Sequence, residues 1–242
     1  MTAERKDVDM ENQDKSRQEI CRELSIGELF EEGHTIAEPL LKQHVYPWEA
    51  LAGIKDFIRE TGCRLSSDEY DSPRPGVWIH KTAIVAPSAF IGDDVIIGAQ
   101  TEVRHCAFIR GSAIIGNGCV VGNSTELKNV ILFDSVQVPH YNYVGDSILG
   151  FKSHMGAGAI TSNVKSDKTL ICVIFGDKKM QTGLKKFGAI LGDYVEVGCG
   201  SVLNPGTVIG RHTNIYPLSS VRGYVPAQGI YKRQGEVVKK HR

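Results

Sequence analysis

The stretch VWIHKTAIVAPSAFIGDDVIIGAQTEVRHCAFIRGSAIIGNGCVVGNSTEL, residues 77–127, decides the fold of this chain. An aliphatic residue recurs in it at every sixth position: Ile79, Val85, Ile91, Ile97, Val103, Ile109, Ile115, Val121 and Leu127. A helix needs a period of about 3.6 residues and a single strand a period of about two, so neither explains the pattern. A solenoid does, because each hexad then supplies one short strand and one corner. We therefore predict a mainly β protein, a left-handed parallel β-helix of hexapeptide repeats.

The same phase returns near the C-terminus, at Leu191, Val197, Leu203, Ile209, Ile215 and Val221. Small residues often follow the aliphatic position and suit tight corners, as at Gly92, Gly98, Gly116 and Gly122. Three hexads close one triangular coil, so residues roughly 18 positions apart stack on successive coils.

We divide the whole chain into three regions. Residues 1–76 form a polar and helical N-terminal extension that ends in a linker, residues 77–227 form the β-helix, and residues 228–242 form a basic C-terminal tail. Residues 1 to about 25 are charged, and helical spacing begins near residue 26. We expect a helix that has Pro47 in its first turn and ends at Gly62. This extension is predicted to pack against the solenoid rather than to carry catalysis.

Two irregularities interrupt the hexads. The phase slips by four residues between Phe133 and Tyr143, and residues 162–188 carry no hexad pattern. Insertions bulge outwards from a rigid solenoid and commonly build its functional site, so we look for chemistry at these two places.

Composition excludes several classes of function. Acidic and basic residues balance at 28 each, which argues against a nucleic-acid scaffold. No apolar run reaches the length of a membrane span, and the charged N-terminus does not resemble a signal peptide. The six cysteines lack C-x-x-C spacing. We expect a cytoplasmic protein that contacts neither membrane nor nucleic acid.

Arg110 and Lys128 are 18 residues apart, and each stands where glycine usually follows the aliphatic residue. Stacked on successive coils, they would repel each other unless solvated or bridged by an anion such as phosphate. The alternative is two solvated surface cations, one of them paired with Glu126.

His140 lies in the first irregularity, and a histidine held in such a corner is a candidate general base. The alternative is an ordinary surface histidine. His105, His140 and His154 suggest a metal site as a further hypothesis, but they lack the close histidine pair that a zinc site of this fold needs, so no metal is expected.

Residues 77–227 resemble the C-terminal β-helix of the bifunctional sugar-1-phosphate nucleotidylyltransferase/acetyltransferases, the family of UDP-N-acetylglucosamine pyrophosphorylase/glucosamine-1-phosphate N-acetyltransferase. The string TELKNVILFDSVQVPHYNYVGDS (125–147) matches a V-E-x-K block followed by H-x-x-Y-x-G-D, and GAGAITSN (156–163) matches G-A-G-T-x-x-x-N. The later string KKFGAILGDYVEVGCGSVLNPGTVIG (185–210) is closer to archaeal-type members.

The resemblance implies an acetyl-CoA-dependent N-acetyltransferase that acts, as a homotrimer, on an amino-sugar phosphate or a sugar nucleotide. His140 would be the general base. Asn163 and the Gly156, Ala157, Gly158 block would line the acetyl-CoA side. The implied substrate-binding residues are Arg110, Glu126, Lys128, Tyr143, His154 and Lys168.

This chain departs from the family pattern in three ways. His154 stands where the family has an asparagine, and Val164 and Lys165 replace a tyrosine and an aspartate. Residues 1–76 contain no nucleotide loop of the G-x-G-T-R-M type. The alternative function is therefore a non-catalytic trimeric module that binds a sugar phosphate or sugar nucleotide and partners a separate nucleotidylyltransferase.

Overall fold

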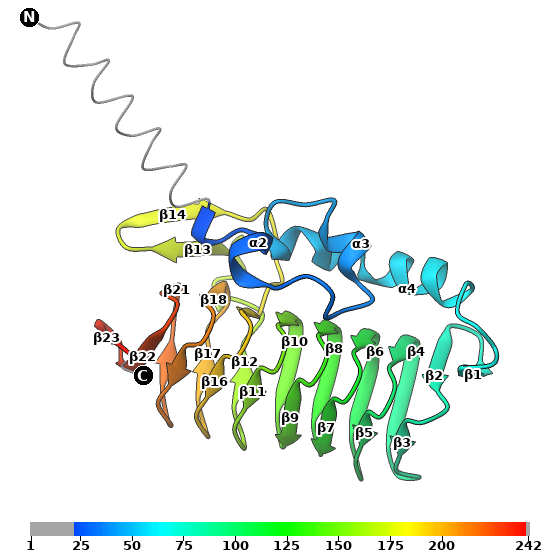
Figure 1. Ribbon diagram of the computed structural model, residues 1–242. Coiled ribbons are helices and arrows are strands. Elements are labelled where there is room, and N and C mark those ends of the chain that lie inside the picture. Colours follow the sequence, from blue (N-terminus) through cyan, green and yellow to red (C-terminus); the bar gives the residue numbers. More distant parts are fainter. Residues whose placement is uncertain (1–21, 241–242) are drawn as a thin grey trace, which may run out of the picture.

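The computed structural model describes residues 22–240, so residues 1–21 of the charged N-terminal stretch, and residues 241–242, lie outside the described part. The repeat region coils into a solenoid of stacked parallel strands, with a small helical extension packed along one side (Figure 1). The predicted fold class is confirmed: the chain is mainly β and its parallel strands follow the hexads. No helix within residues 22–240 is long and apolar enough to cross a membrane.

Two faces of the solenoid share four long strands that turn a corner: β4 (Phe90–Ile97), β6 (Phe108–Ile115), β8 (Glu126–Leu132) and β10 (Tyr143–Leu149). We call their first halves face 1, their second halves face 2, and the turn between them the 1–2 corner. Face 2 begins with β2 (Val77–His80). Face 1 continues as β12 (Ile160–Thr161), β17 (Val202–Leu203) and β20 (Ser220–Val221). Face 2 continues as β15 (Ala189–Leu191), β18 (Thr207–Ile209) and β21 (Tyr224–Val225).

Face 3 is a separate nine-stranded sheet. Its parallel strands are β3 (Ile84–Val85), β5 (Glu102–Val103), β7 (Val120–Asn123), β9 (Gln137–His140), β11 (His154–Met155), β16 (Glu196–Val197), β19 (Asn214–Ile215) and β22 (Gly229–Arg233). The turn that leads from face 3 back to face 1 is called the 3–1 corner.

The aliphatic residue of each hexad points into the solenoid. From Ile97 to Leu127 these residues are buried, whereas Ile79, Val85 and Ile91 are only half-buried. Val85 and Ile91 are less buried because their strands pair with a neighbouring strand on one side only. Each fully buried aliphatic side chain contributes about 1.5–3 kcal/mol to stability, so the repeat itself supplies the core.

The first irregularity of the sequence lies elsewhere than predicted. Residues 137–140 form the regular strand β9, and the slip arises from two coils that are each one residue short at the 1–2 corner. Ile109 pairs with Leu127, 18 positions apart, but Leu127 pairs with Val144 and Tyr143 with Ile160, 17 positions apart in each case. Because strand register is otherwise kept, the shortening is confined to the corner.

The second irregularity is an insertion. Strand β10 pairs with β12 on face 1 and with β15 on face 2, so the coil closes across the insertion. The inserted segment leaves the 1–2 corner and contains an antiparallel hairpin, β13 (Cys172–Phe175) and β14 (Lys178–Gln181). The ring of Phe175 stacks on that of Tyr224 at 4.9 Å, which holds the hairpin beside face 2.

The helical extension covers face 2. It consists of α2 (Ile26–Leu29), α3 (Glu38–Leu41), the 3-10 helix η1 (Pro47–Ala52) and α4 (Ile54–Gly62), with η1 and α4 packed against β4, β6, β8 and β10 (Figure 1). The expected helix therefore begins at Pro47 and ends at Gly62, but in two pieces. Gly62 has a packing role as well, since a Cβ there would lie 2.4 Å from the Trp78 ring.

Two segments outside the repeat hold more structure than the sequence suggested. Part of the expected linker forms β1 (Tyr70–Arg74), which pairs antiparallel with β2 because Gly76, at φ +81°, permits the turn. Part of the expected tail forms β23 (Glu236–Lys239), which pairs antiparallel with β22. Strand β1 thus extends the sheet of face 2 at one end of the solenoid, and β23 extends face 3 at the other.

A buried carboxylate ties the extension to the solenoid. Asp193 is 0% exposed and accepts hydrogen bonds from the backbone N–H groups of Glu31 at 2.6 Å and Phe151 at 2.8 Å. Arg211 forms an ion pair with Glu31, and its Nε lies 3.7 Å from Asp193. His34 stacks on Phe151 at 3.7 Å. Burial raises the pKa of Asp193 to about 7.

We predict that Asp193 makes stability depend on pH. Its folded-state pKa lies above the ordinary value of about 3.9, so its contribution is complete below about pH 4 and is lost as the pH rises through about 7. The thermal midpoint of the wild type should fall by a few degrees between pH 5 and pH 8, and that of Asp193→Asn by clearly less. Equal pH slopes in differential scanning calorimetry would refute this assignment.

Candidate active site

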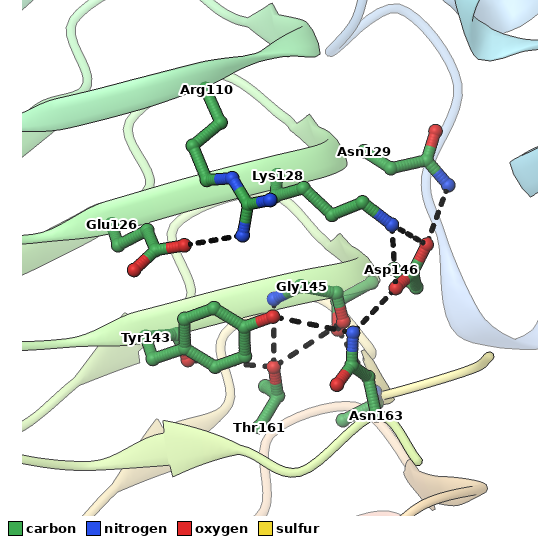
Figure 2. Close-up of polar contacts among 11 residues, drawn as sticks. Arg110, Glu126, Lys128, Asn129, Tyr143, Gly145, Asp146, Thr161 and Asn163 are labelled. Atoms are coloured by element: carbon green, nitrogen blue, oxygen red, sulfur yellow. Dashed lines mark hydrogen bonds and ion pairs between the residues drawn. The ribbon is translucent and has the colours of Figure 1, made fainter. Parts of the chain in front are cut away.

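An exposed ion pair opens the candidate site on face 1. Arg110 Nη1 donates to Glu126 Oε1 at 2.9 Å, with side chains 48% and 31% exposed (Figure 2). Glu126 begins β8, on the coil that follows Arg110. The pairing of Arg110 with Glu126 is therefore the one that the surface-cation alternative described.

A second ion pair lies at the shortened 1–2 corner. Lys128 Nζ donates to both carboxylate oxygens of Asp146, at 2.9 and 3.1 Å, and Asp146 is only 5% exposed at its side chain. The predicted stacking of Arg110 on Lys128 is wrong, because the missing corner residue places Gly111 rather than Arg110 opposite Lys128. Each cation has its own carboxylate, so mutual repulsion does not call for an anion.

An amide joins this corner to face 1. Asn163 follows β12, and its Nδ2 donates to Asp146 Oδ2 at 2.5 Å and to the Tyr143 hydroxyl at 3.2 Å (Figure 2). Thr161 Oγ1 accepts a hydrogen bond from the Gly145 N–H at 2.9 Å. The sequence pattern thus brings Tyr143, Lys128 and Asn163 together around one buried carboxylate.

Tyr143 is a protonated phenol at neutral pH. Partial burial raises its pKa above the ordinary value near 10, and the negative charges of Glu126 and Asp146 raise it further. Its ring lies over Gly145, whose absent side chain makes room: a Cβ there would stand 2.5 Å from the Tyr143 hydroxyl.

His140 lies at the 3–1 corner, across face 1 from the 1–2 corner. It is exposed, it ends β9, and within residues 22–240 its imidazole makes no hydrogen bond or ion pair. The G-A-G block lies on the next coil beneath it, where the Gly158 N–H donates to the His140 carbonyl at 2.9 Å. Asn142, 2% exposed, donates to the carbonyls of Gly156 and Ala159 and so fixes this corner.

Two of the expected site residues are not part of these clusters. His154 lies on face 3, where its Nδ1 is 2.9 Å from Glu196 Oε2 on the neighbouring strand β16. Lys168 is exposed in the insertion, and Lys165 rather than Lys168 folds back there, onto Asp167 at 3.4 Å. Within the described residues, no three His, Cys, Asp or Glu side chains gather closely enough to hold a metal.

The residues expected to hold acetyl-CoA lie at both corners. Asn163 belongs to the 1–2 corner, and residues 156–158 belong to the 3–1 corner beneath His140. A cofactor that contacts both sets would therefore cross face 1.

Sequence reasoning missed Asp146, although it ends the quoted H-x-x-Y-x-G-D block. The sequence did contain a signal: Asp146 directly follows Gly145 at a corner, one coil away from Lys128, which indicates an ion pair between the two. Asp146 has φ 49°, a left-handed conformation that aspartate and asparagine tolerate better than most residues.

Residues 107–217 match the family described as GMPPB C-terminal domain. The chain is 29% identical over 200 residues to a bifunctional protein GlmU of Methanococcus maripaludis, which covers 81% of this chain and 48% of that protein. It is 32% identical over 91 residues to a bifunctional sugar-1-phosphate nucleotidylyltransferase/acetyltransferase of Sulfurisphaera tokodaii, covering 38% and 23%. The chain thus spans less than half the length of either relative, and the similarity agrees with the resemblance seen in the sequence.

Among solved structures, a hexapeptide transferase family protein from Anaplasma phagocytophilum is similar with a TM-score of 0.40. It is 14% identical, over 69% of this chain and 80% of that one.

We predict that Gly145→Ala displaces Tyr143 without unfolding the chain. The new methyl group would meet the Tyr143 hydroxyl at 2.5 Å and Asn163 Nδ2 at 3.0 Å, and both are ends of side chains rather than backbone atoms. A crystal structure should show the Tyr143–Asn163 hydrogen bond broken, at a stability cost of about 1 kcal/mol. Gly27→Ala, where no atom lies within 4 Å, is the control. An unmoved Tyr143 ring would contradict the prediction.

Proposed function

We propose that this chain is an acetyl-CoA-dependent N-acetyltransferase whose acceptor is an amino-sugar phosphate or a sugar nucleotide. One observation carries the proposal most directly. The motif residues Lys128, Tyr143 and Asn163 converge on one corner, and His140 stands across the same face of the solenoid. The similarity to a bifunctional nucleotidylyltransferase/acetyltransferase over 38% of the chain, and to a bifunctional protein GlmU over 81% of it, supports the same proposal.

The proposed reaction is a direct transfer. The acceptor amine attacks the thioester carbonyl, His140 takes the proton that the nitrogen loses, and a C–N bond forms as the C–S bond breaks. CoA leaves as a thiolate and regains a proton. A backbone N–H stabilises the oxyanion that develops on the carbonyl oxygen. His140 suits this role because its ring is exposed and uncommitted among the described residues.

Binding of the acceptor phosphate is assigned to Arg110 and Lys128, each already held by a carboxylate. Arg110 is 48% exposed, so a phosphate oxygen is able to replace Glu126 in a charge-assisted hydrogen bond. Lys128 directs two of its three N–H donors at Asp146, and the third remains for a ligand. In this proposal the phosphate binds to cations that are already paired with carboxylates, so it replaces or adds to an existing ion pair.

The proposed assembly is a homotrimer that binds CoA between neighbouring solenoids. The helical extension covers face 2, and faces 1 and 3 are left for contacts with other copies. His140 lies at the corner between these two faces, where a neighbouring copy would complete the site.

A second candidate is the non-catalytic module that binds a sugar phosphate or sugar nucleotide and partners a separate nucleotidylyltransferase. The observation that favours it is His154, which pairs with Glu196 on face 3 in place of the family asparagine. Calorimetric binding of a sugar nucleotide, with no turnover of acetyl-CoA, would favour this module over the enzyme.

We expect the purified chain to release CoA from acetyl-CoA in the presence of glucosamine-1-phosphate or a related amino sugar. CoA should be separated chromatographically, because Cys63, Cys106 and Cys199 are exposed thiols that react with colorimetric reagents. His140→Ala should lower kcat by about a hundredfold or more, since a positioned general base supplies roughly that factor.

His105→Ala is the matched control, because His105 is also an exposed histidine of the 3–1 corner, and its ring Nδ1 lies 3.1 Å from the Ser88 hydroxyl. It should leave the rate unchanged. Absence of CoA release with every acceptor in the panel would overturn the proposed function.

A further inference from the structure

Asp146 is the most heavily engaged side chain of the 1–2 corner. Its Oδ1 accepts hydrogen bonds from Lys128 at 2.9 Å and from Asn129 Nδ2 at 3.0 Å, and its Oδ2 accepts from Asn163 at 2.5 Å (Figure 2). Only 5% of its side chain is exposed. A buried carboxylate with this many donors holds each of them in a fixed position.

The carboxylate decides which way the Asn163 amide faces. An ionised carboxylate only accepts hydrogen bonds, so the amide must present its NH₂ group to Asp146. The second N–H of that group goes to the Tyr143 hydroxyl. The Asn163 carbonyl oxygen is therefore turned away from both partners and is left as the amide's acceptor for a ligand.

The same chain of hydrogen bonds fixes the role of Tyr143. Its oxygen accepts from Asn163, and within residues 22–240 its own O–H meets no acceptor. Because the phenol stays protonated, that O–H remains a donor towards a ligand.

We infer that Asp146 is a positioning residue that sets the polarity of the site, so that Asn163 faces a ligand as an acceptor and Tyr143 as a donor. The inference rests on the proposed function for its ligand. The matching chemical group carries a donor beside an acceptor: the hydroxyls of the amino-sugar acceptor, or the N–H and C=O of the acetamido group that the transfer creates. A phosphate at neutral pH offers acceptors almost alone, so it would not face Asn163.

The test compares Asp146→Asn with a matched control in the full-length chain. An asparagine at position 146 keeps the size of the side chain but is able to donate as well as accept, so Asn163 loses its enforced orientation. Asp94→Asn is the control: Asp94 has the same left-handed corner conformation, φ 57°, and a buried side chain, 8% exposed, but it binds Arg59 of the helical extension.

For each variant, kcat/KM for the amino-sugar acceptor and a ligand-free crystal structure are compared with those of the wild type. Asp146→Asn should lower kcat/KM for the amino-sugar acceptor by about tenfold or more. In a crystal structure at a resolution that separates nitrogen from oxygen, the Asn163 amide should be reversed, with its oxygen towards the new amide and the Tyr143 hydroxyl. Asp94→Asn should leave both unchanged. An Asn163 amide whose NH₂ group still faces position 146 in the Asp146→Asn crystal overturns the inference, whatever the rate.

A reciprocal swap guards against a variant that fails to fold. Asn163→Asp alone sets two carboxylates at hydrogen-bond distance and should be inactive. The double variant Asp146→Asn with Asn163→Asp restores a carboxylate–amide pair and keeps an acceptor facing the ligand. The Tyr143 hydroxyl then donates to the new carboxylate, so the rate should stay below that of the wild type. It should recover at least tenfold over Asn163→Asp, and absence of recovery in a folded protein overturns the inference. If the wild type shows no transfer at all, the proposed function fails, and the crystal structure still decides the role of Asp146.

Discussion

The register of hydrogen bonds between successive coils is the constraint on which this structure depends. Parallel strands on all three faces hold each coil against the next, so a residue removed from one coil changes only the corner where it is missing. Two coils lack one residue at the 1–2 corner, and there Lys128 meets Gly111 instead of Arg110. The shortened corner brings Lys128, Asp146 and Asn163 within hydrogen-bond distance and creates the candidate site without disturbing the core.

Electrostatics at this site follow from the same geometry. Arg110 and Lys128 are each balanced by a carboxylate, which keeps the corner close to neutral before any ligand arrives. A neutral site of alternating charges suits a zwitterionic ligand, such as an amino-sugar phosphate, better than a simple anion. At the other end of face 2, just after β15, Asp193 joins the helical extension to the coils.

The hexad spacing was enough to predict the solenoid, because every sixth residue is aliphatic and the structure buries each one partly or fully. The insertion at 162–188 was also visible as a loss of that spacing, and helical spacing located the extension. The position of the first irregularity could not be predicted. A coil that is one residue short shifts the phase of the hexads but does not show at which corner the residue is missing. Contacts such as Glu31 with Asp193, 162 positions apart, depend on the folded arrangement and leave no local pattern.

A crystal structure of the chain with CoA and glucosamine-1-phosphate tests the central claim most directly. The account predicts the phosphate at Arg110 and Lys128, the sugar across face 1 against Tyr143 and Asn163, and the amine directed at His140. Well-ordered ligand bound on face 3 around His154 and Glu196, with the 1–2 corner left as it is in the free protein, would contradict it.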